Sequence, residues 1–254
     1  MWRCYSLKMP ELKHPEIIEV WERADQGHAN AYRCGADDEQ SYYVKSLGAT
    51  WRGLVCEWVA ARLALAFGLP IAPFAQVLID EGFAQFLQSA GNRHLVAGLA
   101  FASRVAPHTR EFEPTLLPKC APEFRRDLAA FDWWVCNADR TLGDYSGNPN
   151  LLWNTEDAVP VVIDHNMAFD LEFEPRKFLE THIFRADLAA LKTDLVMRAE
   201  YEQRFSSLVP LLKDIWAELP QNWLETEDGI SRFLQSEFLR VLDRVNQPQF
   251  WDTP

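Results

Sequence analysis

Residues 137–170 constrain the fold more than any other part of this chain. They contain two short apolar runs, at 151–153 and 159–163, separated by polar residues of turn composition. We expect two antiparallel strands joined by a tight loop, with about 4.8 Å between the strands. Such a hairpin brings the residue before its first strand next to the residue after its second strand, here Asn150 and Asp164. An amide oxygen and a carboxylate placed together are suitable ligands for Mg²⁺.

Asp139 lies just upstream of this hairpin, in a loop rich in Gly, Asn and Ser. An Asp, an Asn, two strands and a second Asp follow the order of base, metal-binding Asn and metal-binding Asp in protein kinases. The proline between the two asparagines biases Asn148 towards extended backbone, which suits a turn and favours Asn150 as the metal ligand. The opposite assignment of the two asparagines is the alternative. If each aspartate is considered without the other residues of the pattern, a structural interpretation is available. Asp139 would be a residue at the end of a helix, paired with Arg140, and Asp164 would be a turn residue.

At these positions the sequence resembles the HipA-like kinases and, more distantly, the phosphatidylinositol-kinase-like branch. The resemblance rests on N-x-D-R…N-P-N-L-L-W…I-D-H-x-x-A-F and covers residues 17–191. It is closest to the short HipA-like proteins that lack an additional N-terminal subdomain. Asn150 follows Asp139 by eleven residues, whereas about five are usual, which indicates an insertion at 142–147. His165 and Asn166 stand where other protein kinases carry Phe-Gly.

The resemblance implies a bilobal, kinase-like α+β fold. It predicts a small β-rich N-lobe over residues 1–103 and a mainly helical C-lobe over residues 104–254. ATP and Mg²⁺ are expected in the cleft, with Asp139 orienting the acceptor hydroxyl and Arg140 stabilising the catalytic loop. The expected acceptor is a Ser or Thr hydroxyl on a protein. A small-molecule or lipid acceptor is the alternative, as is an ATP-binding pseudokinase that acts as an interaction module.

Lys45 lies among strand-forming residues, and Glu57 follows twelve residues later in an apolar helical segment. A lysine on an alternating strand often faces solvent. Kinases, however, need one strand lysine to neutralise nucleotide phosphates. Because a charge in so apolar a segment requires a partner, we expect Lys45 and Glu57 to pair, and the resemblance assigns them the phosphate-binding role.

A loop of small residues before the lysine strand stands where a phosphate-covering loop would lie. Its candidate residues are Gly27, His28, Ala29 and Asn30. Backbone N–H groups of small residues can approach phosphate oxygens, but a single glycine also suits an ordinary hairpin tip. Some HipA-like kinases autophosphorylate a serine in this loop. That switch does not carry over, because residues 25–40 contain neither Ser nor Thr.

Residues 98–103 are expected at the junction of the two lobes, where backbone groups would contact adenine. The candidate contacts are Leu99, Ala100 and Phe101. The alternative is a core strand that leads to a connector, and both can hold. Residues 107–122 contain four prolines and are predicted to form that connector.

The remaining elements follow from hydrophobic periodicity. We expect strands at residues 17–21, 41–47, 74–79, 83–87 and 96–101, with a polar loop or hairpin at 26–40. We expect helices at residues 53–67, from 122 into the catalytic loop, and at 178–191, 198–218 and 230–245.

Composition narrows the function classes. A net charge of −12 disfavours a nucleic-acid partner, because duplex binding requires a basic surface. Five scattered cysteines without a C-x-x-C pair, in a chain without a signal peptide, predict a reduced, cytoplasmic protein. No apolar run approaches the roughly 18 residues of a membrane span. The expected partners are therefore ATP and a protein substrate, with an antitoxin or regulatory partner left open.

Overall fold

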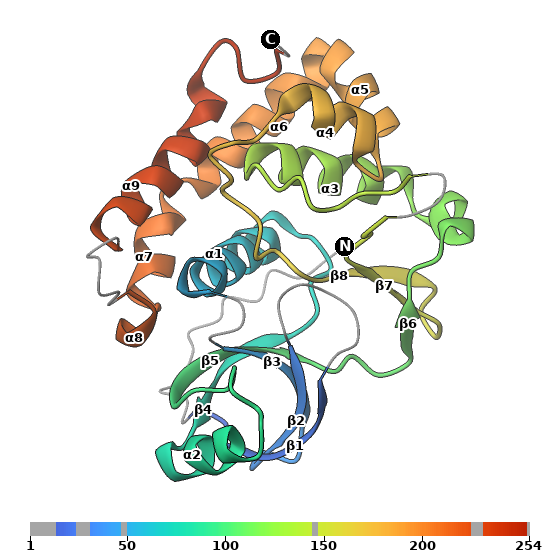
Figure 1. Cartoon of the computed structure of the whole chain (residues 1–254). Coiled ribbons are helices and arrows are strands. Elements are labelled where there is room, and N and C mark those ends of the chain that lie inside the picture. The colour runs from blue at the N-terminus through green and yellow to red at the C-terminus, as the bar shows by residue number, and fades with distance from the viewer. Residues whose placement is uncertain (1–13, 24–30, 47–49, 144–146, 225–230, 253–254) are drawn as a thin grey trace.

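The structure, a computed structural model, describes residues 14–23, 31–46, 50–143, 147–224 and 231–252. The larger of two β-sheets forms one end of the molecule, and most helices gather at the other end (Figure 1). Helix α1 (Trp51–Phe67) lies between these two parts. The chain therefore has the mixed α+β, two-part organisation that the sequence predicts.

The larger sheet is antiparallel, with the strand order β1-β2-β3-β5-β4. Its strands are β1 (Ile17–Arg23), β2 (Tyr32–Ala36), β3 (Ser41–Lys45), β4 (Phe74–Ile79) and β5 (Gly98–Arg104). The backbone N–H of Leu78 donates to the carbonyl of Pro15, at 2.8 Å, so the start of β1 meets β4 and the sheet curls towards closure. Its inner face buries a small apolar cluster that includes Val44 and Ala100. Lys45 points to the opposite face.

One predicted strand is wrong: residues 83–87 belong to helix α2 (Glu81–Ser89). Asp80 caps this helix, accepting from the backbone N–H groups of Gly82 at 2.8 Å and Phe83 at 3.1 Å. Ala84 and Leu87, three residues apart, are buried against the small cluster. The N-cap residue and the i, i+3 pair outweigh the short apolar run that suggested a strand.

Helix α1 begins at Trp51, two residues before its predicted start. Thr50 caps it by accepting from the N–H of Gly53 at 3.1 Å, and Gly68 ends it with a left-handed φ of 100°. Twelve of its seventeen residues are buried. A helix that is apolar on nearly all sides must be enclosed by other elements, and α1 belongs to the main core together with the C-terminal helices.

The predicted hairpin is confirmed as β7 (Leu151–Asn154) and β8 (Val159–Val162). Asn154 shapes its turn by accepting from the backbone N–H groups of Glu156 and Asp157, at 2.9 and 3.0 Å. The proline-rich connector contributes β6 (Thr109–Glu111), which pairs with β7, and a 3₁₀ helix η2 (Pro114–Lys119).

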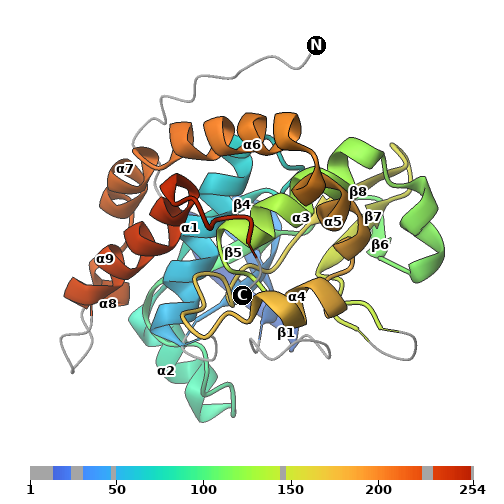
Figure 2. The same ribbon diagram turned by 90° about the horizontal axis from the view of Figure 1, so that it is seen from above.

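The helical part comprises α3 (Pro122–Trp134), α4 (Pro175–Thr181), α5 (Arg185–Thr193), α6 (Leu195–Leu208), α7 (Leu211–Ala217), α8 (Gln221–Leu224), α9 (Ser231–Leu242) and η3 (Asp243–Asn246). Figure 2 shows α6, α7 and α9 packed along one side of α1. No described helix combines the length and apolar character needed to cross a membrane.

Two helices predicted as continuous are interrupted. The predicted helix 198–218 breaks between α6 and α7 at Pro210, because proline lacks an N–H and its ring clashes with the preceding turn. The predicted helix 178–191 splits into α4 and α5 around His182, whose side chain binds buried Asp132. Beyond it, the N–H of Ile183 donates to the carbonyl of Arg140 at 3.1 Å.

Candidate active site

Lys45 joins the larger sheet to α1 and to the end of β8. Its Nζ donates to Glu57 Oε2 and to Asp164 Oδ1, both at 2.8 Å. Burial by itself lowers the pKa of Lys45, but Asp164 and Glu57 together raise it above its ordinary value, so the ammonium stays charged. Burial raises the pKa of Glu57, while Lys45 holds the pKa of Asp164 low against the effect of burial. The expected pair has thus formed, with Asp164 as a third member.

Glu57 also binds the segment that follows Asp164. Its Oε1 accepts from the backbone N–H of His165 at 3.0 Å. Burial lowers the pKa of His165 to about 3, so its ring is neutral at pH 7. The ring packs edge-on against Phe131, with 6.2 Å between the ring centroids, which indicates a structural role for this histidine.

Asp139 is brought together with both asparagines of the loop. Its Oδ2 accepts from Asn148 Nδ2 at 2.9 Å and from Asn150 Nδ2 at 2.8 Å. Because an ionised carboxylate can only accept hydrogen bonds, both amide NH₂ groups face Asp139 and each Oδ1 remains as an acceptor. Asn150 is buried and Asn148 is exposed. This geometry admits either asparagine as a metal ligand.

Backbone conformation explains the residue types at two of these positions. Asn150 has a φ of 47° and Asp164 a φ of 58°, both in the left-handed region. Asn and Asp enter this region more readily than other residues with a side chain. The two residues flank the hairpin, and the N–H of Ile163 donates to the carbonyl of Asn150 at 3.1 Å, closing its open end.

Arg140 is a fully buried hub beneath the hairpin. Its Nε donates to Asp132 Oδ2 at 2.7 Å. Its Nη1 donates to the carbonyls of Pro149 at 3.2 Å, Ile163 at 3.4 Å and Asn150. Arg140 has no exposed surface and holds together the residues that precede the first strand and follow the second strand of the hairpin. This contact pattern agrees with the stabilising role that the resemblance implies.

Two residues that were not predicted from the sequence, Asp132 and His182, support Arg140. His182 Nε2 donates to Asp132 Oδ2 at 3.0 Å, and its Nδ1 accepts from the N–H of Phe184 at 3.1 Å, which fixes the neutral tautomer. Burial lowers the pKa of His182. Burial opposes ionisation of Asp132, yet Arg140 and His182 bring its pKa down to about 2. A carboxylate inside an apolar helical stripe was the available signal, since such a charge requires a partner.

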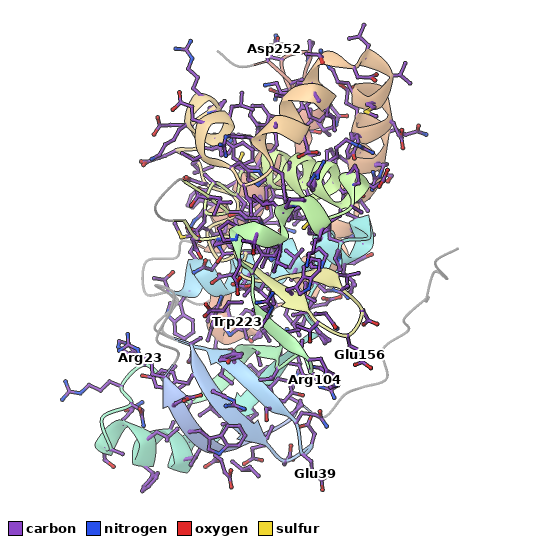
Figure 3. The ribbon with its side chains drawn as sticks, turned by 90° about the vertical axis from the view of Figure 1, so that its right-hand side faces the viewer. Arg23, Glu39, Arg104, Glu156, Trp223 and Asp252 are labelled. Carbon is purple, nitrogen blue, oxygen red and sulfur yellow. The ribbon has the colours of Figure 1, made fainter. Side chains whose placement is uncertain are left out.

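The nucleotide-contact candidates are placed only in part. The phosphate-loop residues Gly27, His28, Ala29 and Asn30 lie outside the described residues. Leu99, Ala100 and Phe101 lie within β5, and Phe101 stands opposite Lys45. Trp223, which is labelled in Figure 3, donates from Nε1 to the carbonyl of Leu99 at 2.7 Å. Adenine contact at these three residues stays a prediction.

The oxygen atoms around the hairpin suit a hard cation. Asp164 supplies a carboxylate and the asparagines supply amide oxygens, the ligand types that Mg²⁺ combines with substrate phosphates. Within the described part of the chain, no three His, Cys, Asp or Glu side chains form a metal-binding group by themselves. In phosphoryl-transfer sites, substrate phosphate oxygens contribute to the coordination of the metal.

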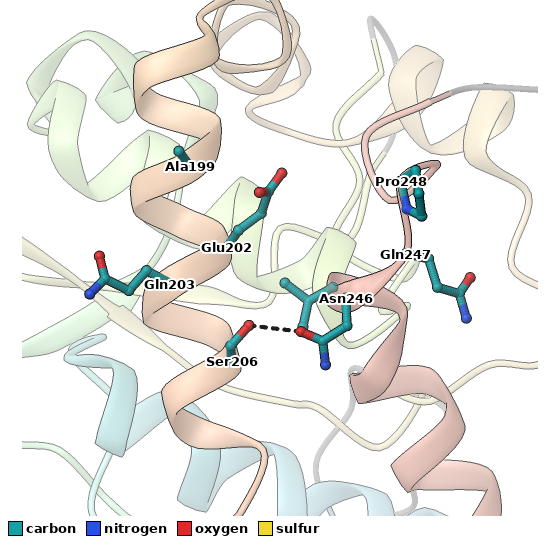
Figure 4. A pocket seen from close by; sticks show the side chains of 8 residues that line it. Ala199, Glu202, Gln203, Ser206, Asn246, Gln247 and Pro248 are labelled. Atoms are coloured by element: carbon teal, nitrogen blue, oxygen red, sulfur yellow. Dashed lines mark hydrogen bonds between the residues drawn. The ribbon is translucent and has the colours of Figure 1, made fainter.

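A separate polar hollow of about 430 Å³ lies between α6 and the C-terminal segment (Figure 4). It is lined by Ala199, Glu202, Gln203, Ser206, Val245, Asn246, Gln247 and Pro248. None of the candidate site residues is among the residues that line it.

A curled sheet with this strand order, a strand lysine paired with a helix glutamate, and an Asp–Asn–hairpin–Asp loop define a bilobal, kinase-like fold. The family model described as HipA-like kinase matches residues 17–254, beyond the range 17–191 on which the resemblance rests. The chain belongs to the HipA-like kinase family and is accordingly a kinase-type phosphotransferase. Membership implies ATP and a divalent metal.

Several solved structures are similar to this chain, and among them is the crystal structure of the Helicobacter pylori proinflammatory kinase CtkA. It has a TM-score of 0.49 and 11% sequence identity, covering 90% of this chain and 92% of that chain. No curated protein matches the sequence.

Proposed function

We propose that this protein is an ATP- and Mg²⁺-dependent kinase that transfers the γ-phosphoryl group of ATP to a Ser or Thr hydroxyl on a protein. The supporting observation is that Asp139 accepts hydrogen bonds from Asn148 and Asn150, and that Asn150 adjoins the open end of the hairpin. Asp164 follows the other strand at this open end and meets the Lys45–Glu57 pair. Phosphoryl transfer relies on positioning and charge neutralisation, and these residues provide both.

The proposed roles follow from the contacts. Lys45, oriented by Glu57, neutralises phosphate charge from the sheet side of the cleft. Asp139 orients the acceptor hydroxyl and accepts its proton. Asp164 and Asn150, with Asn148 as the alternative, would hold Mg²⁺. Mg²⁺ bound there would neutralise negative charge on the transferring phosphate.

We also propose a division of the chain into two lobes and a location in the cell. We assign residues 1–103 to the N-lobe and 104–254 to the C-lobe, with residues 27–30 facing phosphate and 99–101 facing adenine. A cytoplasmic location is supported by the four described cysteines, all buried and none in a disulfide. They are Cys34, Cys56, Cys120 and Cys136.

The test is phosphate transfer from γ-labelled ATP with Mg²⁺, using purified protein alone and with cell lysate. Asp139→Ala should lower transfer by at least about 100-fold, the usual contribution of a positioned base. Asp157→Ala, at the exposed turn of the hairpin, is the matched control and should keep activity. ATP affinity is measured in parallel and should be similar in all three proteins.

Label on a discrete lysate protein, lost in Asp139→Ala, would support a protein kinase. Label on a small molecule or lipid would refute the protein acceptor while keeping the phosphotransferase. ATP binding without transfer to any acceptor would indicate a pseudokinase. Full activity of Asp139→Ala would refute the role given to this residue.

A further inference from the structure

The C-terminal helices hold the first turns of α1 in place. Arg52, in the first turn of α1, donates from Nη1 to Glu237 Oε2 of α9 at 3.1 Å. Its Nη2 donates to the carbonyl of Phe169, in the segment after Asp164, at 2.8 Å. Phe169 also stacks on Phe238 of α9, with 4.0 Å between centroids. One guanidinium thus joins α1, α9 and the segment that carries a proposed metal ligand.

A second contact holds α1 further along its length. Glu218, directly after α7, accepts from Trp58 Nε1 at 3.1 Å and from Arg62 Nη2 at 2.6 Å, both on α1. The carbonyl of Glu218 accepts from Gln76 Nε2 of β4 at 2.8 Å. Helix α1 is therefore tied to the edge of the larger sheet through the C-terminal part of the chain, which lies beside it in Figures 1 and 2.

Glu57 lies between these two attachments, five residues after Arg52 and next to Trp58. Lys45 divides its ammonium charge between Glu57 and Asp164 at equal distances of 2.8 Å. If α1 moved away, Lys45 would keep Asp164 as its carboxylate partner. The full ammonium charge would then compete with a divalent cation for Asp164.

We propose that Arg52 and Glu218 are positioning residues that fix α1 so that Glu57 shares Lys45, which leaves Asp164 able to bind metal. This inference rests on the proposed function, since it concerns the same metal site. Both residues act through the placement of α1. The C-terminal helices thereby become part of the phosphotransfer machinery.

The test compares Arg52→Ala with Arg52→Lys and with Arg240→Ala, a matched control at an exposed position of α9. Arg52→Ala should raise the Mg²⁺ concentration for half-maximal transfer several-fold and lower kcat/KM about tenfold, as expected for loss of charged hydrogen bonds. Arg52→Lys, which can keep the contact with Glu237, should recover part of the loss. Arg240→Ala should behave as the unchanged protein.

Hydrogen–deuterium exchange provides a readout that does not depend on activity. Arg52→Ala should speed exchange in the first half of α1, and Glu218→Gln in the second half, while exchange in α3 stays unchanged. A general loss of stability would instead speed exchange in both helices and leave the Mg²⁺ requirement of the active fraction unaltered.

Unchanged α1 exchange in both variants would overturn the inference, as would accelerated exchange with an unaltered Mg²⁺ requirement in active protein. If Arg52→Ala did not fold, the nearly isosteric Glu218→Gln would decide by the same two readouts. If the unchanged protein transferred no phosphate, the proposed function would fail first. Mg²⁺-dependent ATP binding in the variants would then replace the transfer assay.

Discussion

The replacement Asp132→Asn tests whether a buried charge network supports the catalytic loop. Asp132 has no exposed side-chain surface and accepts from Arg140 Nε, His182 Nε2 and Asn137 Nδ2 at 2.7, 3.0 and 2.9 Å. An asparagine offers one acceptor oxygen and turns an NH₂ group towards at least one of these donors. It also leaves the buried Arg140 guanidinium without its carboxylate.

Two observations give the expected loss in the free energy of unfolding for Asp132→Asn. Removing one partner of a buried ion pair costs about 3–5 kcal/mol, and asparagine keeps part of the hydrogen bonding, so we expect about 3 kcal/mol of destabilisation at pH 7. Independently, the pKa of Asp132 falls from 3.8 to about 2 on folding, which corresponds to about 2 kcal/mol of stability from ionisation. The two values agree in order of magnitude.

The shifted pKa of Asp132 also predicts how the stability of the fold depends on pH. Because the pKa of Asp132 is lower in the folded state, its ionisation stabilises the fold above about pH 4, and this contribution is lost as the pH falls through about 2. About 1 kcal/mol of it should be gone by pH 3. Asp132→Asn has no such group, so its deficit relative to the unchanged protein should shrink by about 1 kcal/mol between pH 7 and pH 3.

Urea unfolding of both proteins at the two pH values measures these free energies. Glu200→Gln, at an exposed position of α6, serves as the control and should change stability by less than about 0.5 kcal/mol. A deficit of Asp132→Asn below about 0.5 kcal/mol at pH 7 would refute the network's role. A deficit that grew on acidification would refute the sign of the pKa argument.

Three further predictions follow from local geometry. Asn150→Ala should raise the Mg²⁺ requirement of phosphate transfer more than Asn148→Ala, since Asn150 is the more buried and adjoins β7; Mg²⁺ titrations of the two variants decide. Gly98→Ala should lower the free energy of unfolding by about 1–2 kcal/mol, because the φ of Gly98 is 108° and the added Cβ would lie 3.0 Å from Asn222 Nδ2. Urea unfolding measures this change, and an unchanged midpoint urea concentration would contradict the prediction. Burial raises the pKa of the thiols of Cys34, Cys56, Cys120 and Cys136 to about 11–12. Iodoacetamide at pH 7 should therefore label these cysteines slowly in the folded protein and rapidly in urea, and site-resolved mass spectrometry measures the two rates.

The hairpin and its flanking polar residues could be predicted because they are local. Two apolar runs, a turn and left-handed positions filled by Asn and Asp are encoded within thirty-four residues. The pairing of Lys45 with Glu57 could also be predicted, because a buried charge has few possible partners nearby in sequence. Elements were misassigned where the deciding feature was a cap or a break, as at Asp80 and Pro210.

The contacts that hold the site together could not be predicted in this way. Asp132 meets His182 across fifty residues, and Arg52 meets Glu237 across 185. Neither pair has a spacing rule, because each depends on how whole helices pack against α1 and α3. Periodicity reports which face of a helix is apolar, but it does not report which helix will cover that face.

The order and identity of the chemical groups can be read from the sequence: a lysine, a glutamate, an aspartate, an asparagine and a final aspartate, with the turns and strands that space them. Three features depend on tertiary packing: Lys45 contacts two carboxylates, Arg140 is buried, and the C-terminal helices share one apolar core with α1. The difference lies in how far apart in the sequence the interacting residues are. Turns, caps and strands follow from interactions within a few residues, whereas charge neutralisation in a buried site depends on segments that packing alone brings together.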